Sequence, residues 1–480
     1  MPCLRPHTAS SFGSAKKLLL ASRPGSPLAC VISLGCPKNL VDSEHILGYL
    51  GQAGFAITTR PQDANLIVIN TCAFLASAVQ EARQAIMRYL RLKHRRAGTK
   101  IVVAGCLVQR YGSRLACDFP DVDIFLGIDE IPKLPQLVSG ADSRSQTQDT
   151  TFGDKPLPCS LYGAKTPRLV STPRHYAYLR IAEGCNNRCS YCLIPSLRGA
   201  LRCRTVSDIL AEARLLLGNQ ARELILIAQD TTAYHSDGHS LPELLRRLSQ
   251  LVDLRWLRLL YTHPGHFSPR LIDEIAMNPK IVKYVDVPLQ HVNNRVLARM
   301  NRPYRRTGID RLVRQLEAIP GMVLRTTFLV GFPGETEAEF SELLAFVAEG
   351  HFTHVGCFAF SREPGTKAYR MRAQVPWSLA TERAQRLLAI QRRVALRLNQ
   401  RLVGRVVEAV IDRPGPGQQL VGRTIGDAPE IDRTLHITSS DQTDSDLLRD
   451  ISRHAQVGSF VKVRITKVRA YDLYGVIAER

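Results

Sequence analysis

The sequence predicts an α/β protein in three parts: an N-terminal open parallel α/β domain at residues 28–140, a central β/α barrel, complete or partial, at residues 171–402, and a small antiparallel β-barrel at residues 403–480. Three observations predict this order. Continuous apolar runs alternate with helical patterns in the first part, six strand patterns alternate with helices in the second, and short strands separated by turns fill the last. The length of 480 residues suits about three hydrophobic cores.

The composition indicates a protein that binds a polyanion. The chain has 64 Lys and Arg against 43 Asp and Glu, a formal net charge of +21. This charge favours RNA or a ribonucleoprotein as partner, and a well-solvated basic surface is the alternative. No apolar run approaches the ~18 residues of a membrane span, so we expect no membrane contact. The twelve cysteines, without a secretory signal, favour metal or redox chemistry in the cytoplasm over disulfides.

The first segment, residues 1–27, contains no acidic residue and is rich in Ser, Ala and Pro. Disordered tails and organelle transit peptides share this composition. The apolar stretch "LLLA" is too short for the core of a signal peptide. We therefore expect a disordered basic extension rather than a targeting segment.

In the N-terminal domain, three apolar runs each end on a cysteine. "ACVISLGC" ends at Cys36, "NLIVINTC" at Cys72 and "KIVVAGC" at Cys106. The runs are typical of buried parallel strands, whose carboxyl ends share one edge of a sheet. A single cysteine at such a place is most often a small buried filler. Three in register predict a shared metal site.

The central domain follows a polar linker at residues 141–170, whose Ser, Asp, Gly and Pro content does not sustain periodic burial. Strand patterns alternate with helices, and in β/α barrels the chemistry lies at the carboxyl ends of the strands. "AQD" at 228–230, "LQH" at 289–291 and "GFPGE" at 331–335 follow strands and are expected at the same mouth. The six strand patterns occupy residues 176–184, 222–230, 256–264, 284–291, 323–335 and 354–361.

The C-terminal part begins after a long Arg-rich helix at residues 378–402. In "VKVRIT" the apolar residues alternate with Lys462 and Arg464, which predicts an apolar face inside a barrel and a cationic face outside. A cationic strand face suits backbone phosphates, although solvated strands often have the same pattern.

The stretch "CNNRCSYC" places Cys185, Cys189 and Cys192 within eight residues. A zinc site needs a fourth cysteine or histidine at finger spacing, and the next cysteine, Cys203, lies beyond a loop containing Pro195. Three thiolates can instead hold a 4Fe-4S cluster and leave one iron open to a small molecule. An open metal position indicates catalysis.

This motif, with Tyr191 before its last cysteine, resembles the signature of radical S-adenosylmethionine (SAM) enzymes. The resemblance implies that SAM binds the open iron and is cleaved to a deoxyadenosyl radical. For SAM contacts we expect Tyr191, Gln229 and Gly334, which lie near strand ends. The "GFPGE" segment is equally compatible with a plain turn.

From Ala29 to its end, the chain resembles the radical SAM methylthiotransferases. The resemblance implies a second 4Fe-4S cluster on Cys36, Cys72 and Cys106, which carries the sulfur to be inserted, and a C-terminal TRAM module with an OB-like barrel. "SLGCPKNLVDSE", "IAQDTTAY", "LARMNRP" and "DAPEID" resemble the branch that modifies an aspartate of small-subunit ribosomal protein S-twelve. The alternative branch modifies an adenosine of tRNA.

The resemblance thus implies a transferase that replaces a β-carbon hydrogen of that aspartate with a methylthio group. One SAM donates the methyl group and a second supplies the radical. The implied partners are the ribosomal protein or its subunit, an electron donor of the flavodoxin or ferredoxin type, and RNA at the TRAM module. A third reading, a non-catalytic iron–sulfur protein that binds RNA, does not account for an open SAM-type cluster.

Overall fold

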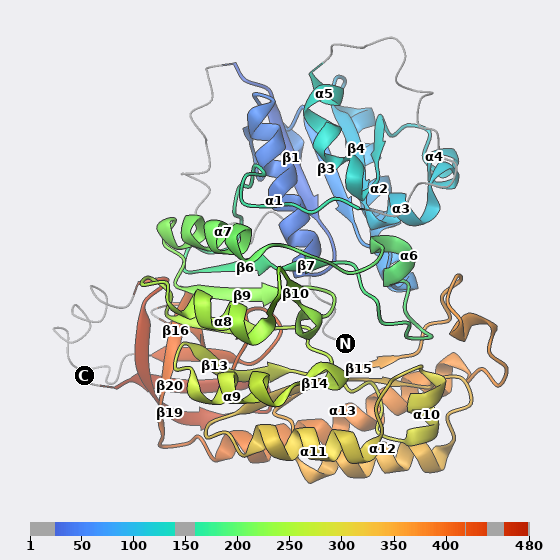
Figure 1. Cartoon of the computed structure of the whole chain (residues 1–480). Coiled ribbons are helices and arrows are strands. Elements are labelled where there is room, and N and C mark those ends of the chain that lie inside the picture. The colour runs from blue at the N-terminus through green and yellow to red at the C-terminus, as the bar shows by residue number, and fades with distance from the viewer. Residues whose placement is uncertain (1–24, 140–158, 418, 439–455, 479–480) are drawn as a thin grey trace.

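The computed structural model describes residues 25–139, 159–417, 419–438 and 456–478. Most of the predicted basic extension and the first part of the predicted linker lie outside the described residues. Figure 1 shows the N-terminal domain resting on the central domain, with the C-terminal barrel beside the latter. No helix in the described segments combines the length and the apolarity needed to cross a membrane.

The N-terminal domain contains a five-stranded, all-parallel sheet in the order β2-β1-β3-β4-β5. This confirms the predicted open α/β domain, and the three predicted strands are the neighbours β1, β3 and β4. The strands are β1 Leu28–Ser33, β2 Ala56–Ile57, β3 Leu66–Thr71, β4 Lys100–Gly105 and β5 Ile124–Leu126. The helices are α1 Pro37–Gln52, α2 Ala76–Arg95, α3 Cys106–Tyr111, α4 Ser113–Asp118 and α5 Leu134–Val138.

The central domain contains a six-stranded parallel sheet in the order β15-β14-β13-β12-β9-β6, which follows the chain from one edge to the other. The barrel is therefore partial. All six predicted strands are present: β6 Tyr176–Arg180, β9 Glu223–Ile227, β12 Trp256–Leu259, β13 Ile281–Asp286, β14 Val323–Val330 and β15 His354–Ala359. The helices between them are α6 Ile194–Arg198, α7 Val206–Gly218, α8 Leu241–Ser249, α9 Pro269–Met277, α10 Asn294–Arg299, α11 Arg306–Glu317 and α12 Glu337–Glu349.

Two short antiparallel pairs were not predicted: β7 with β8, and β10 with β11. They are too short for a periodic pattern in the sequence to reveal them. Their bounds are β7 Ala182–Glu183, β8 Arg202–Cys203, β10 His235–Ser236 and β11 His239–Ser240.

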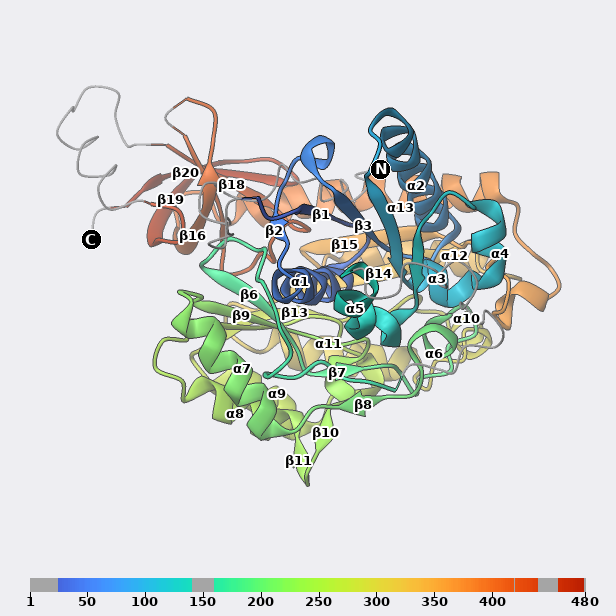
Figure 2. The ribbon, with the colours of Figure 1, turned by 90° about the horizontal axis from the view of Figure 1, so that it is seen from above.

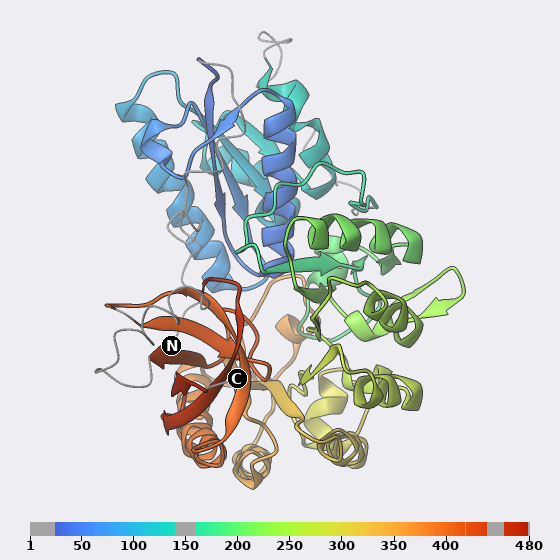
Figure 3. The same cartoon turned by 90° about the vertical axis from the view of Figure 1, so that its left-hand side faces the viewer.

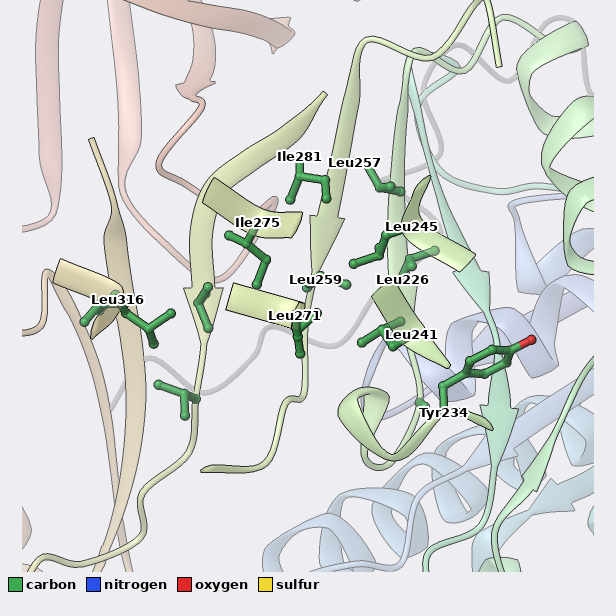
Figure 4. Packing of buried hydrophobic residues seen from close by; sticks show 14 of the residues in the cluster. Leu226, Tyr234, Leu241, Leu245, Leu257, Leu259, Leu271, Ile275, Ile281 and Leu316 are labelled. Atoms are coloured by element: carbon green, nitrogen blue, oxygen red, sulfur yellow. The ribbon is translucent and has the colours of Figure 1, made fainter. Parts of the chain in front are cut away.

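Side chains alternate between the two faces of the central sheet, and each face has its own core. On one face, Leu226 and Leu259 pack against the helices, for example against Leu245 of α8 (Figure 4). On the other face, Tyr178 and Ile227 pack against residues of both other domains. One face of the sheet therefore forms the core of the central domain, and the other face forms the interface with the two other domains.

The C-terminal barrel is a closed ring in the order β16-β17-β18-β20-β19, reached through the long helix α13 Trp377–Gln400 (Figure 3). Four of its pairs are antiparallel as predicted, but β18 and β20 are parallel. A ring with an odd number of strands cannot alternate direction all the way round, so at least one pair must be parallel. The strands are β16 Val406–Pro414, β17 Leu420–Thr424, β18 Thr434–Thr438, β19 Phe460–Val468 and β20 Asp472–Ile477.

The alternation predicted for β19 is confirmed. Val463 and Ile465 are buried inside the barrel, and Lys462 and Arg464 are exposed. The outer surface of β19 therefore presents cations to solvent.

The barrel is fixed to the central sheet by buried contacts. Phe460 packs edge-on against Trp256, with ring centroids 4.8 Å apart. Glu223 of the sheet accepts from Arg258 at 2.7 Å and lies 2.5 Å from Arg423 of the barrel. Buried ion pairs lose hydration as they form, so they specify the docking geometry more than they stabilise it.

The described part of the predicted linker, residues 159–170, packs between the two α/β domains. Arg168 donates to Glu44 of α1 at 2.6 Å and to Glu212 of α7 at 2.5 Å. On α1, a Cβ at Gly48 would lie 2.5 Å from the Pro167 backbone, so only glycine fits under this segment. Figure 2 shows α1 lying over the sheet of the central domain, and its Leu40 and Val41 share a core with Tyr176 and Tyr178 of β6.

Candidate active site

The first cysteine triad lies at one edge of the N-terminal sheet. Cys36 caps the start of α1 after β1, Cys72 follows β3 directly, and Cys106 begins α3 after β4. Burial, together with the neighbouring Cys106 and Cys36, raises the pKa of Cys72 to about 12. The predicted convergence at neighbouring strand ends is present in the structure.

The backbone before Cys36 is adapted to this closeness. Gly35 has φ 99°, and a Cβ on it would lie 2.8 Å from the Cβ of Cys72. Only glycine permits both the dihedral angle and the contact. The "GC" pair is therefore a requirement of the site.

The second triad occupies the loop between β7 and α6 in the central domain. Cys192 donates its backbone N–H to the Cys189 carbonyl at 3.1 Å. Burial, together with Cys189 and Cys185, raises the pKa of Cys192 to about 12. The charges of the three cysteines are thus close enough to interact, and a cluster on them stays a prediction.

Neither triad has the spacing of a single-ion site. Within the described residues, the only three potential ligands whose atoms gather within 4.8 Å are Asp230, His263 and His266. The thiols of each triad interact electrostatically but do not all lie within 4.8 Å of one another. Three thiolate donors at a wider spacing fit a 4Fe-4S cluster.

Each triad has an arginine that donates to one sulfur. Arg198 Nη2 lies 3.2 Å from Cys106 Sγ, and Arg302 Nη1 lies 3.5 Å from Cys189 Sγ. Arg198 follows the second triad in sequence but contacts the first in space, so the segment after the second triad reaches the first triad across the domain boundary. Neither arginine was predicted as a site residue, although Arg302 lies within the "LARMNRP" stretch.

A buried charge network holds Arg198 in place. Its Nη2 also donates to Asp42 and to Asn39 at 2.8 Å each, and its Nη1 lies 3.4 Å from Glu183. Burial alone would raise the pKa of Asp42, but Arg180 and Arg198 outweigh it and lower that pKa. Asp42 therefore stays ionised between two guanidinium groups.

The three residues expected to contact SAM lie in different surroundings. The side chain of Gln229 donates from Nε2 to Glu183, while its Oε1 is buried and has no partner among the described residues. Tyr191 packs edge-on against Phe332 of the "GFPGE" segment, with centroids 6.5 Å apart. The structure thus brings Tyr191 and this segment together. The orphaned Gln229 oxygen fits an acceptor for the amino group of SAM.

Gly334 has a packing requirement of its own. Its φ is 77°, and a Cβ there would lie 3.0 Å from the Arg299 guanidinium. Its backbone N–H donates to the Ala373 carbonyl at 2.7 Å. A SAM contact at Gly334 stays a prediction.

A cavity of about 310 Å³ opens beside Cys185. On its wall, Asp230 accepts from Asn187 at 2.7 Å and is 2.8 Å from His266 Nδ1. The hydrogen bond to Asp230 is the main reason that the pKa of His266 is raised. The cavity therefore carries a carboxylate–imidazole pair next to the second triad.

The sequence matches three known families. Residues 29–127 match the uncharacterized protein family UPF0004, residues 179–347 match the Radical SAM superfamily, and residues 403–478 match the TRAM domain. Together these matches cover the three domains of the fold.

A solved structure is similar to the chain in fold. A radical S-adenosylmethionine methyltransferase, TsrM, from Kitasatospora setae, with cobalamin and a [4Fe-4S] cluster bound, matches with a TM-score of 0.51 at 16% identity. The match covers 82% of this chain and 76% of that one. At this identity it bears on the fold alone.

Curated relatives match over nearly the whole chain. The ribosomal protein uS12 methylthiotransferase RimO of Syntrophotalea carbinolica is 44% identical over 455 residues, which cover 94% of this chain and 96% of that protein. The protein of the same name from Geotalea uraniireducens is 42% identical, and the match covers 93% of this chain and 97% of that protein. The chain therefore belongs to the family of ribosomal protein uS12 methylthiotransferases, RimO.

Proposed function

We propose that this protein is a radical SAM methylthiotransferase that inserts a methylthio group at the β-carbon of an aspartate of ribosomal protein uS12. One observation carries the proposal: two cysteine triads lie on different domains, and Arg198, which follows the second triad in the chain, donates to Cys106 of the first at 3.2 Å. Such an arrangement suits a reaction in which one centre generates a radical and the other delivers sulfur.

The cysteines divide the binding of the two 4Fe-4S clusters. Cys185, Cys189 and Cys192 hold the cluster that binds SAM, and the other cluster is held by the N-terminal triad, Cys36, Cys72 and Cys106. When bound, these groups supply a hydrogen-abstracting radical and a methylthio sulfur, which no side chain can supply.

Several side chains of the protein support this chemistry. Arg198 and Arg302 offset the negative charge of the thiolates to which they donate. Gln229 Oε1 accepts from the SAM amino group, and Tyr191 and Gly334 line the remainder of the SAM site. The interdomain core around Leu40 and Val41 excludes water from one side of the site, which protects a radical from side reactions.

The partners follow from the surface and from the family. The exposed Lys462 and Arg464 on β19 suit contact with ribosomal RNA near uS12. A flavodoxin or ferredoxin type protein supplies the electron, and the enzyme acts in the cytoplasm, where its substrate is made.

Gene deletion combined with mass spectrometry tests the proposed substrate. In the deletion strain, uS12 should lack the methylthio group while the methylthio-adenosine of tRNA remains, and the wild-type gene should restore the modified aspartate. Loss of the tRNA modification with uS12 unchanged would refute the proposal and favour the tRNA branch.

A further inference from the structure

Lys38 is a cation in a place where a helix favours anions. It lies in the first turn of α1, two residues after Cys36, and this turn contains no acidic residue. The amino end of a helix carries a partial positive charge, so a lysine there is repelled. A bound anion would remove this repulsion.

The Lys38 ammonium also lacks a hydrogen-bond acceptor in the described part of the chain. Its Nζ contacts the face of the Tyr261 ring, 3.1 Å from the ring centroid. The nearby guanidinium groups are already engaged: Arg180 and Arg198 pair with Asp42, and Arg302 donates to the Pro288 carbonyl. Lys38 is therefore free to bind an anion that enters the site.

Tyr261, beneath Lys38, is held in an unusual conformation. It follows β12 and has φ 60°, which is costly for an aromatic residue. Its N–H donates to Asp286 Oδ2 at 3.0 Å, and its carbonyl accepts from Thr231 at 2.9 Å. These two hydrogen bonds fix the backbone of Tyr261 at the strand ends, and its ring contacts the Lys38 ammonium.

Lys38 lies at the boundary between the two α/β domains. It is two residues after Cys36 of the first triad, and its Nζ stands over the ring of Tyr261, which follows β12 of the central sheet. Burial lowers the pKa of Lys38, as does Arg198, while the charges of Cys36, Glu183 and Asp286 oppose this lowering. An anion bound by Lys38 would therefore sit between the N-terminal triad and the strand ends of the central sheet.

We infer that Lys38 binds the side-chain carboxylate of the substrate aspartate and so selects aspartate over asparagine. The inference rests on the proposed function. In aspartate the carboxylate is bonded to the β-carbon that receives sulfur, so its anchor must lie between the centre that abstracts hydrogen and the centre that delivers sulfur. A lysine ammonium is a compact point charge that can bind one carboxylate without requiring a fixed planar geometry.

Binding measurements with two forms of the substrate test this role. Cluster-loaded wild type, Lys38→Met and Lys38→Arg are each titrated, with SAM present, with purified uS12 and with uS12 whose target aspartate is replaced by asparagine. Lys133→Met, at an exposed site, is the matched control. A hydrogen bond to a charged group contributes about 1.5–3 kcal/mol, so wild type should bind the aspartate form about 10- to 100-fold more tightly.

Lys38→Met should lose this preference, Lys38→Arg should keep much of it, and the control should behave as wild type. Iron content is measured for every variant. Retention of the aspartate preference in Lys38→Met would overturn the inference. So would loss of iron or equal weakening for both substrates, since either would assign Lys38 to the cluster. If wild type binds and modifies neither form, the proposed function itself fails.

Discussion

Arg198 Nη2 lies 3.2 Å from Cys106 Sγ and 2.8 Å from Asp42 Oδ2, so one nitrogen of the central domain contacts both a thiol of the first triad and a carboxylate of the N-terminal domain. All three residues are buried. The position of one triad is thereby fixed relative to the other by a charged contact that water does not screen.

Replacing Arg198 should change the redox potential of the cluster on Cys36, Cys72 and Cys106. Arg198→Gln removes a positive charge and a hydrogen bond from a ligand sulfur, which favours the oxidised cluster and lowers the potential. A charge-assisted hydrogen bond of about 1.5–3 kcal/mol corresponds to a shift on the order of 100 mV for one electron. The measurement is an EPR-monitored titration in a background where Cys185, Cys189 and Cys192 are all alanine.

Arg302→Gln is the matched control for this experiment. Arg302 donates to Cys189, a ligand of the other cluster, so it should leave the potential of the N-terminal cluster unchanged. Arg198→Lys retains the charge and should shift the potential less than Arg198→Gln. Equal potentials in wild type and Arg198→Gln would show that the contact does not tune the cluster.

The two clusters should be separable by single cysteine substitutions. Cys185→Ala should abolish SAM cleavage and leave about half of the iron, because the N-terminal triad is built on a different domain. Cys36→Ala should leave about half of the iron and retain cleavage of SAM to deoxyadenosine. Iron assays and chromatography of deoxyadenosine measure both. Complete iron loss in either folded variant would contradict two independent centres.

Gly184 should be required for the loop that holds Cys185. Its φ is 80°, and a Cβ there would lie 2.0 Å from the Ala200 carbonyl oxygen. Gly184→Ala should therefore displace the loop and lower the iron content. Gly238→Ala is the matched control, with φ 76° and nothing within 4 Å of its Cβ. It should lose only about 1 kcal/mol of stability and no iron. Equal iron in both variants would contradict the steric argument.

Acid should weaken the ion pairs that Glu212 of α7 makes with Arg168 and Arg204. Burial raises the pKa of Glu212, but Arg168 and Arg204 outweigh it, and the pKa falls from 4.5 to about 2. The folded carboxylate is thus stabilised by about 3 kcal/mol above pH 4.5, and this stabilisation is lost as the pH falls towards 2. Urea unfolding of wild type and Glu212→Gln should differ most at neutral pH and converge in acid. A difference independent of pH would exclude this role of the ion pairs.

The cationic face of β19 should contribute to RNA binding in a salt-dependent manner. Substituting Lys462 and Arg464 with serine should weaken binding to ribosomal RNA and reduce the slope of log affinity against log salt by about 1.4–1.8, because each phosphate contact contributes about 0.7–0.9. Arg214 and Arg311, exposed on α7 and α11, form the matched double substitution. If the two double variants lose the same slope, total charge and not this strand governs binding.

Much of the fold could be predicted because the signals are local. Each strand before Cys36, Cys72 and Cys106 is a short apolar run, and parallel strands bring their carboxyl ends together without further information. The parallel pair of β18 and β20 could not be predicted in this way, because it follows from closing an odd ring and not from the composition of either strand.

The parts of the site that could not be predicted depend on contacts between distant segments. Arg198 meets Cys106 across 92 positions of the chain. Lys38 contacts Tyr261 of another domain. The conformation of Tyr261 depends in turn on the hydrogen bond that it donates to Asp286 and on the one that it accepts from Thr231. A charged residue near the end of a helix has the same sequence signal whether it faces solvent or a buried sulfur. Only the packing of the domains distinguishes the two.

The docking of the C-terminal barrel limits how this enzyme can be divided. Asp432 of the barrel accepts from Tyr284 at 2.7 Å, and Phe460 covers Trp256 on the inner face of the sheet. Truncation before β16 would expose the rings of Tyr284 and Trp256 to water, and the exposed apolar surface would promote self-association. The TRAM module thus completes a core of the central domain, and swapping it between enzymes would require the recipient sheet to be redesigned with it.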